Sequence, residues 1–200
     1  MQNKDKTILD LCGGTGAWSK SYKDASYTVY NITLPDYDIR KWQSIPEIMQ
    51  HITEKGEIYG VLAAPPCTKF SKADWRTPKE KRDFKTGMET VKACMNLIWK
   101  IQENGAPLKF WALENPMGYL YNFMGFPHFY FQPWQFGEKG MLATKRTALW
   151  GYFNKPVKTV RVRKIPFIKE KQNHEWYGAS TEKRAMTPSG FAKAFFKANQ

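Results

Sequence analysis

Short apolar runs alternate with helix-like stretches over the first 114 residues, and this alternation constrains the fold most. Residues 42–53 and 88–104 repeat apolar side chains at the three- and four-residue spacing of amphipathic helices. The β-rich runs lie at residues 7–12, 27–33, 58–64 and 108–114. Strands that alternate with helices in this way pair in parallel, so the sequence predicts an α/β fold with a mostly parallel sheet.

The pattern changes after residue 128, where aromatic pieces at 129–136, 147–153 and 157–165 predict antiparallel strands that finish the sheet. Residues 187–200 predict a closing helix, with Thr187 and Pro188 at its start. Its phenylalanines, and the apolar stripe of the 88–104 helix, are expected to be core. That stripe consists of Met88, Val91, Met95, Ile98 and Ile101.

A chain of 200 residues with 42% hydrophobic content fits one compact domain, 1–200. No apolar stretch approaches the twenty residues of a membrane span, and the N-terminus lacks a signal-peptide pattern. Three cysteines without a CxxC pair, and three scattered histidines, indicate neither a disulfide framework nor a metal site. We therefore expect a monomeric cytoplasmic protein with reduced thiols.

The positive charge is concentrated in the C-terminal third. Residues 139–200 hold 14 Lys and Arg side chains against 3 Asp and Glu, a net +11, whereas the rest of the chain carries only +2. Such asymmetry favours a polyanion partner, because each phosphate contact releases counterions. A solvated basic face that serves solubility is the alternative.

A glycine-rich turn follows the first predicted strand. Glycine lets the backbone approach a ligand closely, and open α/β sheets bind ligands at the carboxyl ends of their strands. The segment lacks the nucleoside-triphosphate and dinucleotide fingerprints, which favours S-adenosylmethionine, although a purely structural turn is the alternative. The residues expected to line a cofactor site here are Asp10, Leu11, Cys12, Gly13, Gly14, Thr15, Gly16 and Trp18.

Two later strands deliver reactive side chains to the same edge of the predicted sheet. Two prolines stiffen the backbone just before Cys67, and Glu114 ends the next strand. A thiolate that adds to C6 of cytosine, while a carboxylic acid bonds N3, makes the poorly nucleophilic C5 an enamine-like carbon. Singly, each residue fits the core or an ion pair; jointly, they predict a nucleophile and a general acid. Lys69 and Arg146 are the cations expected to favour the thiolate.

In their order, these motifs resemble those of the cytosine-C5 DNA methyltransferase family. DLCGGTG is similar to its cofactor loop, APPCTKFS to its nucleophile motif and LENP to its Glu-Asn motif. TKRTALWG resembles the motif whose arginine, here Arg146, holds the target base, and TPSGFAKAFFKAN resembles the terminal segment that closes the cofactor pocket. The likeness spans nearly the whole chain and implies a Rossmann-like class I methyltransferase fold.

The resemblance also implies roles for further residues. Asn31 stands where the family usually has an acidic residue for the cofactor ribose, and Asp38 resembles the adenine-contacting aspartate. The segment 72–85 resembles the loop that closes over an extruded base. Other implied cofactor contacts are Ile39, Pro65 and Ser189. Implied DNA contacts are Lys69, Ser71, Lys72, Arg76, Arg161, Arg163 and Lys164.

The segment 152–186 is short and basic, and it stands where the family usually inserts a large target-recognition domain. The sequence therefore predicts DNA (cytosine-5-)-methylation with low sequence specificity, and the resemblance also fits a virus-encoded enzyme. Two other functions stay open. One is methylation of the free nucleotide dCMP, which needs no recognition domain. The other is a catalytically silent nucleic-acid-binding module of the same fold.

Overall fold

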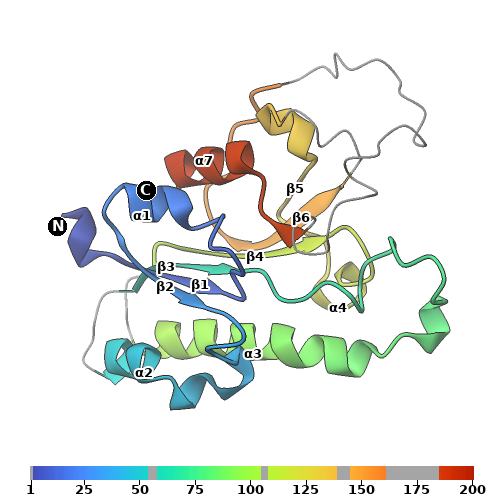
Figure 1. The fold of residues 1–200 in the computed structure, drawn as a ribbon, viewed down its shortest axis with the longest axis horizontal. Helices are drawn as coiled ribbons and strands as arrows, with labels where there is room; N and C mark the ends of the chain where they lie inside the picture. Colours follow the sequence, from blue (N-terminus) through green and yellow to red (C-terminus); the bar gives the residue numbers. More distant parts are fainter. Residues whose placement is uncertain (1, 54–57, 105–107, 139–144, 161–184) are drawn as a thin grey trace.

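A mixed six-stranded sheet runs through the centre of the computed structural model, which describes residues 2–53, 58–104, 108–138, 145–160 and 185–200 (Figure 1). The strand order is β2-β1-β3-β4-β6-β5. The strands are β1 (Thr7–Leu11), β2 (Thr28–Ile32), β3 (Ile58–Ala63), β4 (Phe110–Pro116), β5 (Phe129–Phe131) and β6 (Thr147–Tyr152). The first four pair in parallel, and β6 is antiparallel to β4 and β5. The expected α/β class, mostly parallel with antiparallel strands toward the C-terminus, is confirmed.

Helices cover both faces of the sheet, which gives three layers (Figure 1). One face packs against α2 (Pro46–Thr53), α3 (Phe84–Glu103) and the 3-10 helix η2 (Ile39–Ser44). The other packs against α1 (Lys20–Asp24), α7 (Ser189–Ala198) and the 3-10 helix η4 (Pro133–Phe136). The remaining short helices are η1 (Asn3–Asp5), η3 (Lys79–Lys81) and α4 (Tyr121–Met124). No helix in these described ranges is both long and apolar enough to cross a membrane.

Strand side chains alternate between the two faces, as the pleat of a β-strand requires. Leu9 and Val61 are buried on the α3 face, whereas Ile8 and Leu62 are buried on the α7 face. The α7 face has an aromatic core. Its largest fully buried side chains are Trp18, Tyr22, Phe110, Phe131, Phe191 and Phe195. The stripe expected along the 88–104 helix is also core: three of its residues are buried and its two methionines pack against them.

The C-terminal helix α7 is fastened to the start of the chain. The Tyr22 hydroxyl donates to the backbone carbonyl of Asn199, 3.3 Å away. The Asn199 side chain accepts from the Asn154 N–H at 2.8 Å and donates to the Asn154 and Phe195 carbonyls, each at 3.0 Å. The last residues before Gln200 thereby join α1, α7 and the segment after β6.

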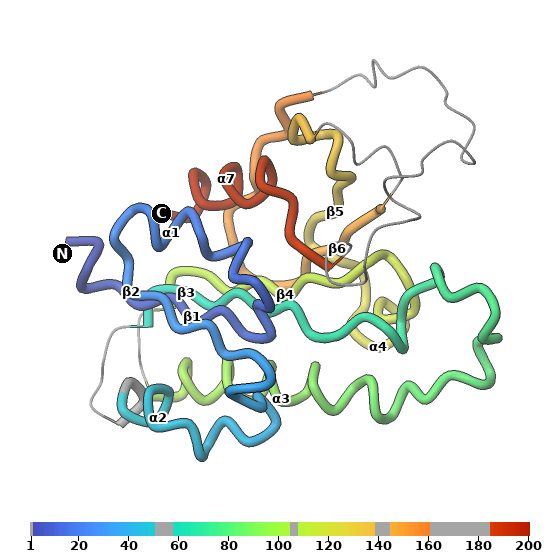
Figure 2. Tube along the Cα trace, in the orientation of Figure 1, coloured from blue at the N-terminus to red at the C-terminus, as the bar shows by residue number. Residues whose placement is uncertain are grey.

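The strand order reverses between β1 and β3. The chain goes from β1 to β2 on one side and returns to place β3 on the other side of β1. Such a switch point opens the ligand crevice of α/β sheets, at the carboxyl ends of the strands. The connections after β1, β3 and β4 all leave the sheet at this end (Figure 2). We call this end the carboxyl edge.

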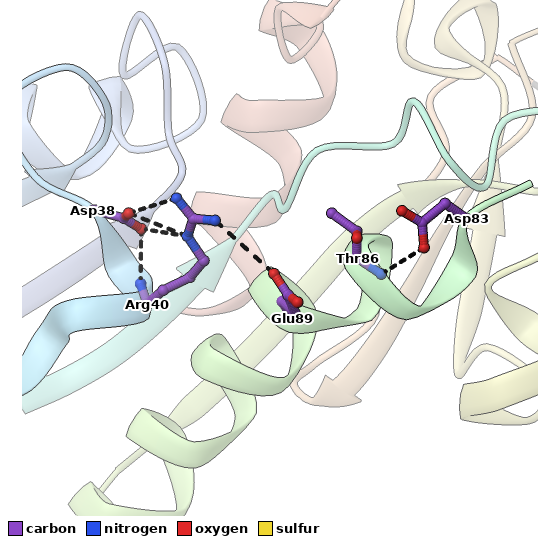
Figure 3. Close-up of polar contacts among 5 residues, drawn as sticks. All are labelled: Asp38, Arg40, Asp83, Thr86 and Glu89. Carbon is purple, nitrogen blue, oxygen red and sulfur yellow. Dashed lines mark hydrogen bonds and ion pairs between the residues drawn. The ribbon is translucent and has the colours of Figure 1, made fainter.

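Several predicted element boundaries are wrong. Residues 133–136 form the 3-10 helix η4 rather than a strand, because Pro133 supplies no backbone donor for a sheet ladder. Residues 157–160 belong to no strand; the rest of the predicted 157–165 strand lies outside the described residues. Helix α3 begins at Phe84, four residues before the predicted start, because the Asp83 carboxylate accepts from the Thr86 N–H and caps it (Figure 3).

The start of α7 also differs from the prediction. Pro188, not Thr187, occupies the N-cap position, and its side chain makes no capping hydrogen bond. The Glu138 carboxylate caps the helix instead, accepting from the Gly190 N–H at 2.5 Å and from the Ser189 hydroxyl at 3.1 Å. A distant acidic side chain thus satisfies one of the free backbone donors at the start of this helix.

Candidate active site at the carboxyl edge

The glycine-rich turn after β1 is tightly constrained. Cys12 has a left-handed φ of 57°, and its N–H donates to the Ile32 carbonyl at 2.7 Å, which ties the turn to the end of β2. A Cβ on Gly13 would lie 2.4 Å from the Asp10 carboxyl carbon and 2.6 Å from the Asn31 Oδ1, so only glycine fits. Gly14 has a φ of 54° and open space around it. Gly14 is exposed and its N–H donates to the Thr33 hydroxyl at 3.2 Å, so a ligand can approach the surface of the turn here without meeting a side chain.

Two acceptor oxygens lie beneath this turn without hydrogen-bond partners in the described part of the chain. One is Oδ1 of Asp10, which is fully buried, and the other is Oδ1 of Asn31. Burial raises the pKa of Asp10 to about 6, although a 2.5 Å hydrogen bond from the Ser19 hydroxyl opposes the shift. The Asn31 amide donates to the Gly14 carbonyl at 2.9 Å. The turn therefore lies over the buried Asp10 carboxyl group. The two unpaired acceptors beneath it are one oxygen of that group and the Asn31 Oδ1.

The remaining residues predicted around the turn have different surroundings. Leu11 is core, and its carbonyl accepts from the Ala64 N–H at 2.9 Å, which joins the ends of β1 and β3. Thr15 and Gly16 lie in the turn itself, and Thr15 is exposed. The Trp18 ring is buried among the phenylalanines of α7. A ligand can therefore reach Thr15 in the exposed turn directly, but not the buried Leu11 and Trp18 side chains.

Asp38 and Ile39 lie at the start of η2 (Figure 3). Both carboxylate oxygens of Asp38 bind the Arg40 guanidinium, the shorter contact being 2.6 Å, and Arg40 also reaches Glu89 on α3 at 4.0 Å. The hydrogen bond from Arg40 lowers the pKa of Asp38. Ile39 is buried in the core beneath. Asp38, through Arg40 and Glu89, therefore links η2 to α3. Ser189 has a structural contact of its own, because its hydroxyl donates to Glu138 at the start of α7.

Cys67 lies in a turn that its neighbours hold firmly. The buried Asn115 side chain at the end of β4 donates to the Pro65 carbonyl at 2.9 Å. The Cys67 carbonyl accepts from the N–H groups of Phe70 and Ser71 at 2.9 and 2.8 Å. The thiol itself is partly exposed. The Cys67 turn is thus fixed to the neighbouring strand before any ligand binds.

Glu114 comes to the same place from β4. Ala63 pairs with Leu113, so Glu114 follows the pair at which β3 gives way to the Cys67 turn. Burial and the negative charge of Glu114 raise the pKa of Cys67, and burial raises the pKa of Glu114. Lys145 opposes both shifts. The three groups therefore act on one another electrostatically, and the thiol is neutral at rest.

Lys145 is the cation of this site that sequence reasoning missed. It lies next to Arg146, immediately before β6. Nothing in the sequence indicates which of two adjacent cations acts on Cys67 and Glu114. The Arg146 carbonyl accepts from the Met117 N–H at 2.8 Å, which places the start of β6 beside the end of β4. The Arg146 guanidinium carbon lies 5.5 Å from the centre of the exposed Tyr130 ring. Lys69, the other expected cation, acts electrostatically on Asp83.

The loop after Cys67 is organised by a second residue that the sequence did not reveal. The Arg82 side chain is only 3% exposed and donates to the carbonyls of Ser71 (2.9 Å), Thr77 (3.1 Å) and Asp74. Its guanidinium carbon lies 5.2 Å from the Tyr119 ring centre. The buried Arg82 guanidinium thus holds together, by hydrogen bonds, carbonyl groups from several positions of this loop.

The residues predicted to contact DNA lie mostly on this loop. Lys69, Lys72 and Arg76 are exposed, and Ser71 is partly buried. The Arg76 guanidinium carbon lies 5.5 Å from the Trp75 ring centre. The other predicted contacts, Arg161, Arg163 and Lys164, lie outside the described residues.

The geometry brings together a turn that can receive a ligand, a thiol, a carboxyl group and two cations at one edge. Within the ranges that the structure describes, His, Cys, Asp and Glu side chains form no group of three that could hold a metal ion. Comparison of the sequence with models of known protein families and with curated proteins found no match.

Proposed function

We propose that the protein is an S-adenosylmethionine-dependent methyltransferase that forms 5-methylcytosine in DNA. The observation that carries the proposal is the meeting of Cys67 and Glu114, from adjacent strand ends, beside the glycine-rich turn. Nucleophilic addition to cytosine needs a thiol and an acid at one base. The motif resemblance, the sheet order and the switch point support a Rossmann-like class I methyltransferase fold.

The residues around the turn suit a cationic cofactor. S-adenosylmethionine supplies a methyl group as an electrophile when it is bound. The exposed turn at Gly14, the partly buried Asn31 amide and the negative charge of Asp10 beneath the turn are the features that would hold it. The unpaired oxygens of Asp10 and Asn31 provide acceptors for a ligand with hydrogen-bond donors.

The steps assigned to this chain are those of acid and nucleophilic catalysis. Cys67 gives its proton to solvent water, and its sulfur forms a bond to C6 of cytosine while Glu114 transfers its proton to N3. The electron pair released at C5 would take up the methyl group, whose bond to the cofactor sulfur would break with S-adenosylhomocysteine as the leaving group. Loss of the C5 proton to water and return of the N3 proton to Glu114 then let the C6–S bond break, which returns the Cys67 thiolate. Arg146 is assigned to the target base and its ribose-phosphate, and Lys145 to the balance of charge at the pair.

The test uses DNA in which 5-fluorocytosine replaces cytosine, with S-adenosylmethionine present. The fluorine at C5 cannot leave as a proton does, so the covalent adduct should persist and migrate as a protein–DNA band on a denaturing gel. Cys67→Ser should abolish the band. Cys94→Ala is the comparison variant: Cys94 is a buried thiol on α3 that is hydrogen-bonded to Cys12 of the glycine-rich turn, and its loss should leave the adduct band in place if Cys67 forms the bond. An equal adduct yield from Cys67→Ser would contradict the proposal.

Methyl transfer to DNA is also compared with transfer to dCMP at two salt concentrations. The DNA reaction should weaken steeply as salt rises, because phosphate contacts release counterions. A salt-independent reaction that prefers dCMP would assign the same chemistry to the free nucleotide instead.

A further inference from the structure

The carboxyl edge carries most of the aromatic side chains that project into solvent. Seven large aromatic residues in the described ranges are exposed, and five of them lie in the connection after β3, in the segment between β4 and β5, or in β5 itself. These five are Trp75, Tyr121, Phe123, Phe126 and Tyr130. The other two are Trp99, toward the end of α3, and Tyr152, at the opposite end of β6. Exposed aromatic surface of this extent, next to a proposed active site, indicates a binding surface.

Two of the five have cations beside their rings. Trp75 is 81% exposed, with Arg76 beside it at 5.5 Å. Tyr130 is 54% exposed, and it has Arg146 at 5.5 Å and Lys158 at 5.6 Å from its ring centre. Trp75 follows the Cys67 turn, and Tyr130 pairs with Ala148 in the strand that Arg146 precedes. The two ring–cation groups therefore lie on the two segments that border the proposed nucleophile and base clamp.

A ring with an adjacent cation matches the chemistry of an unpaired nucleotide. The ring stacks on the face of a base, and the cation meets the neighbouring phosphate. Bases in a duplex are stacked on one another, so their faces are closed to protein rings. Only a single strand, or a base that has left the duplex, offers a face for stacking.

We propose that the aromatic edge, defined by Trp75 and Tyr130 with their cations, binds single-stranded DNA and makes it the preferred methylation substrate. The inference rests on the proposed cytosine methylation and adds the strand state of its substrate. Single-stranded DNA also spares the enzyme the cost of unpairing and unstacking the target base.

The first experiment compares kcat/KM for methyl transfer to one cytosine-containing sequence as single-stranded DNA, as duplex DNA and as RNA, with the natural enzyme. We expect the single strand to be favoured by roughly tenfold or more, which is the scale of losing one or more base–aromatic stacks. Equal or greater activity on the duplex, or a preference for the RNA strand, would overturn the inference and leave cytosine methylation intact.

The second experiment measures binding of the fluorescently labelled single strand by anisotropy. Trp75→Ala and Tyr130→Ala should each weaken binding by roughly tenfold, whereas Trp75→Phe and Tyr130→Phe, which keep a ring, should largely restore it. Trp99→Ala and Tyr152→Ala are matched controls, because these rings are also exposed but lie away from the carboxyl edge. These controls should bind as the unchanged protein does.

An equal loss in the control variants would overturn the assignment of the surface. Ring-dependent binding of single-stranded DNA without methyl transfer to any substrate would support the binding surface and reject the proposed reaction. The two proposals can therefore fail separately.

Discussion

The charge of Glu114 affects the protonation of Cys67. Burial and the Glu114 charge both raise the pKa of Cys67, and burial raises the pKa of Glu114. Protonation of Glu114 removes the negative charge that opposes thiolate formation. In the proposed reaction, the protonated Glu114 that would donate to N3 of cytosine is therefore also the form beside which Cys67 loses its proton more easily. Lys145 favours the ionised form of both groups.

This coupling predicts the reactivity of Cys67 toward iodoacetamide. Glu114→Gln should lower the pKa of Cys67 and speed its alkylation at a given pH below that pKa, because the opposing charge is gone. Lys145→Met should raise the pKa and slow the reaction. Mass spectrometry of the Cys67 peptide across a pH series measures both effects. Lys69→Met is the control, and a change as large as that of Lys145→Met would contradict the assigned role of Lys145.

The raised pKa of Asp10 predicts how the stability of the fold depends on pH. Its pKa is about 6 in the folded protein and near 3.8 when unfolded, so the folded state binds more protons between these values. Its contribution to stability is thus present below about pH 4 and lost as pH rises through 6. Asp10→Asn should raise the unfolding free energy at pH 7 by on the order of 2–3 kcal/mol and flatten this dependence. Urea unfolding at several pH values tests this, and an unchanged slope would contradict it.

The same substitution should weaken binding of S-adenosylmethionine, since it removes the negative charge beneath the turn. Isothermal titration of the folded variant measures that effect separately from its stability. Gain of stability with loss of affinity is the expected combination, because binding sites commonly keep groups that destabilise the fold.

Residues at strand ends were predictable, whereas residues that act across the fold were not. Cys67 and Glu114 follow apolar runs, and parallel strands place such positions at one edge. Lys145 has no such signal, because only the antiparallel pairing of β6 brings it to them. Asp38 shows the opposite case: its sequence position suggested a cofactor contact, but Arg40 occupies both of its oxygens.

At the scale of elements, the loop between β3 and α3 is held from inside rather than by regular secondary structure. Arg82 donates to four of its carbonyls, and the Phe70 carbonyl accepts from the Tyr119 N–H at 2.8 Å. Gly118 is required there, because a Cβ would lie 2.1 Å from the Phe70 carbonyl oxygen. The loop that carries Trp75 therefore has a defined shape and adjoins a fixed Cys67 turn.

Arg82→Met should loosen this loop while leaving the sheet folded. Methionine has no N–H donors to replace those that the buried guanidinium gives to the carbonyls. Lysine would not replace them either, because its ammonium group lacks the planar arrangement of donors. Hydrogen exchange at Ser71 and Tyr119 should become at least roughly tenfold faster, as for loss of about 1–2 kcal/mol of hydrogen bonding. Arg76→Met, an exposed change on the same loop, should leave exchange unchanged. Equal protection in Arg82→Met would refute the role.

The elements of the first 116 residues were largely predictable, because each strand is an apolar run and α3 has a regular stripe. The later elements were less so. The aromatic run 129–136 has strand-like composition throughout, but Pro133 ends the ladder after Phe131. The capping of α7 was invisible in sequence, because Glu138 is distant along the chain.

At the scale of the molecule, the two ends of the described chain depend on each other. Trp18 packs against Phe191 and Phe195 of α7, and Tyr22 binds the Asn199 carbonyl. The α7 face of the sheet therefore has a complete core only when α7 is in place.

Asn199→Ala should destabilise the whole domain. The Asn199 side chain is buried and makes three hydrogen bonds, two of them to the Asn154 backbone after β6. Their loss should lower the unfolding free energy by about 1–3 kcal/mol. Urea unfolding followed by tryptophan fluorescence gives this value. Gln200→Ala, at an exposed neighbour, should have no effect, and equal stability of the two variants would contradict the prediction.

The contact between α1 and α7 also bears on how the protein is made. A ribosome synthesises Trp18 long before Phe191 and Phe195, so the Trp18 ring lacks its α7 partners for most of translation. Tyr22 likewise meets Phe196 only at the end, although its other ring partners, Tyr27 and Phe110, are made earlier. The α7 face of the sheet can close only after the closing helix leaves the ribosome. Nascent chains of this protein should therefore be clients of ribosome-associated chaperones until that moment.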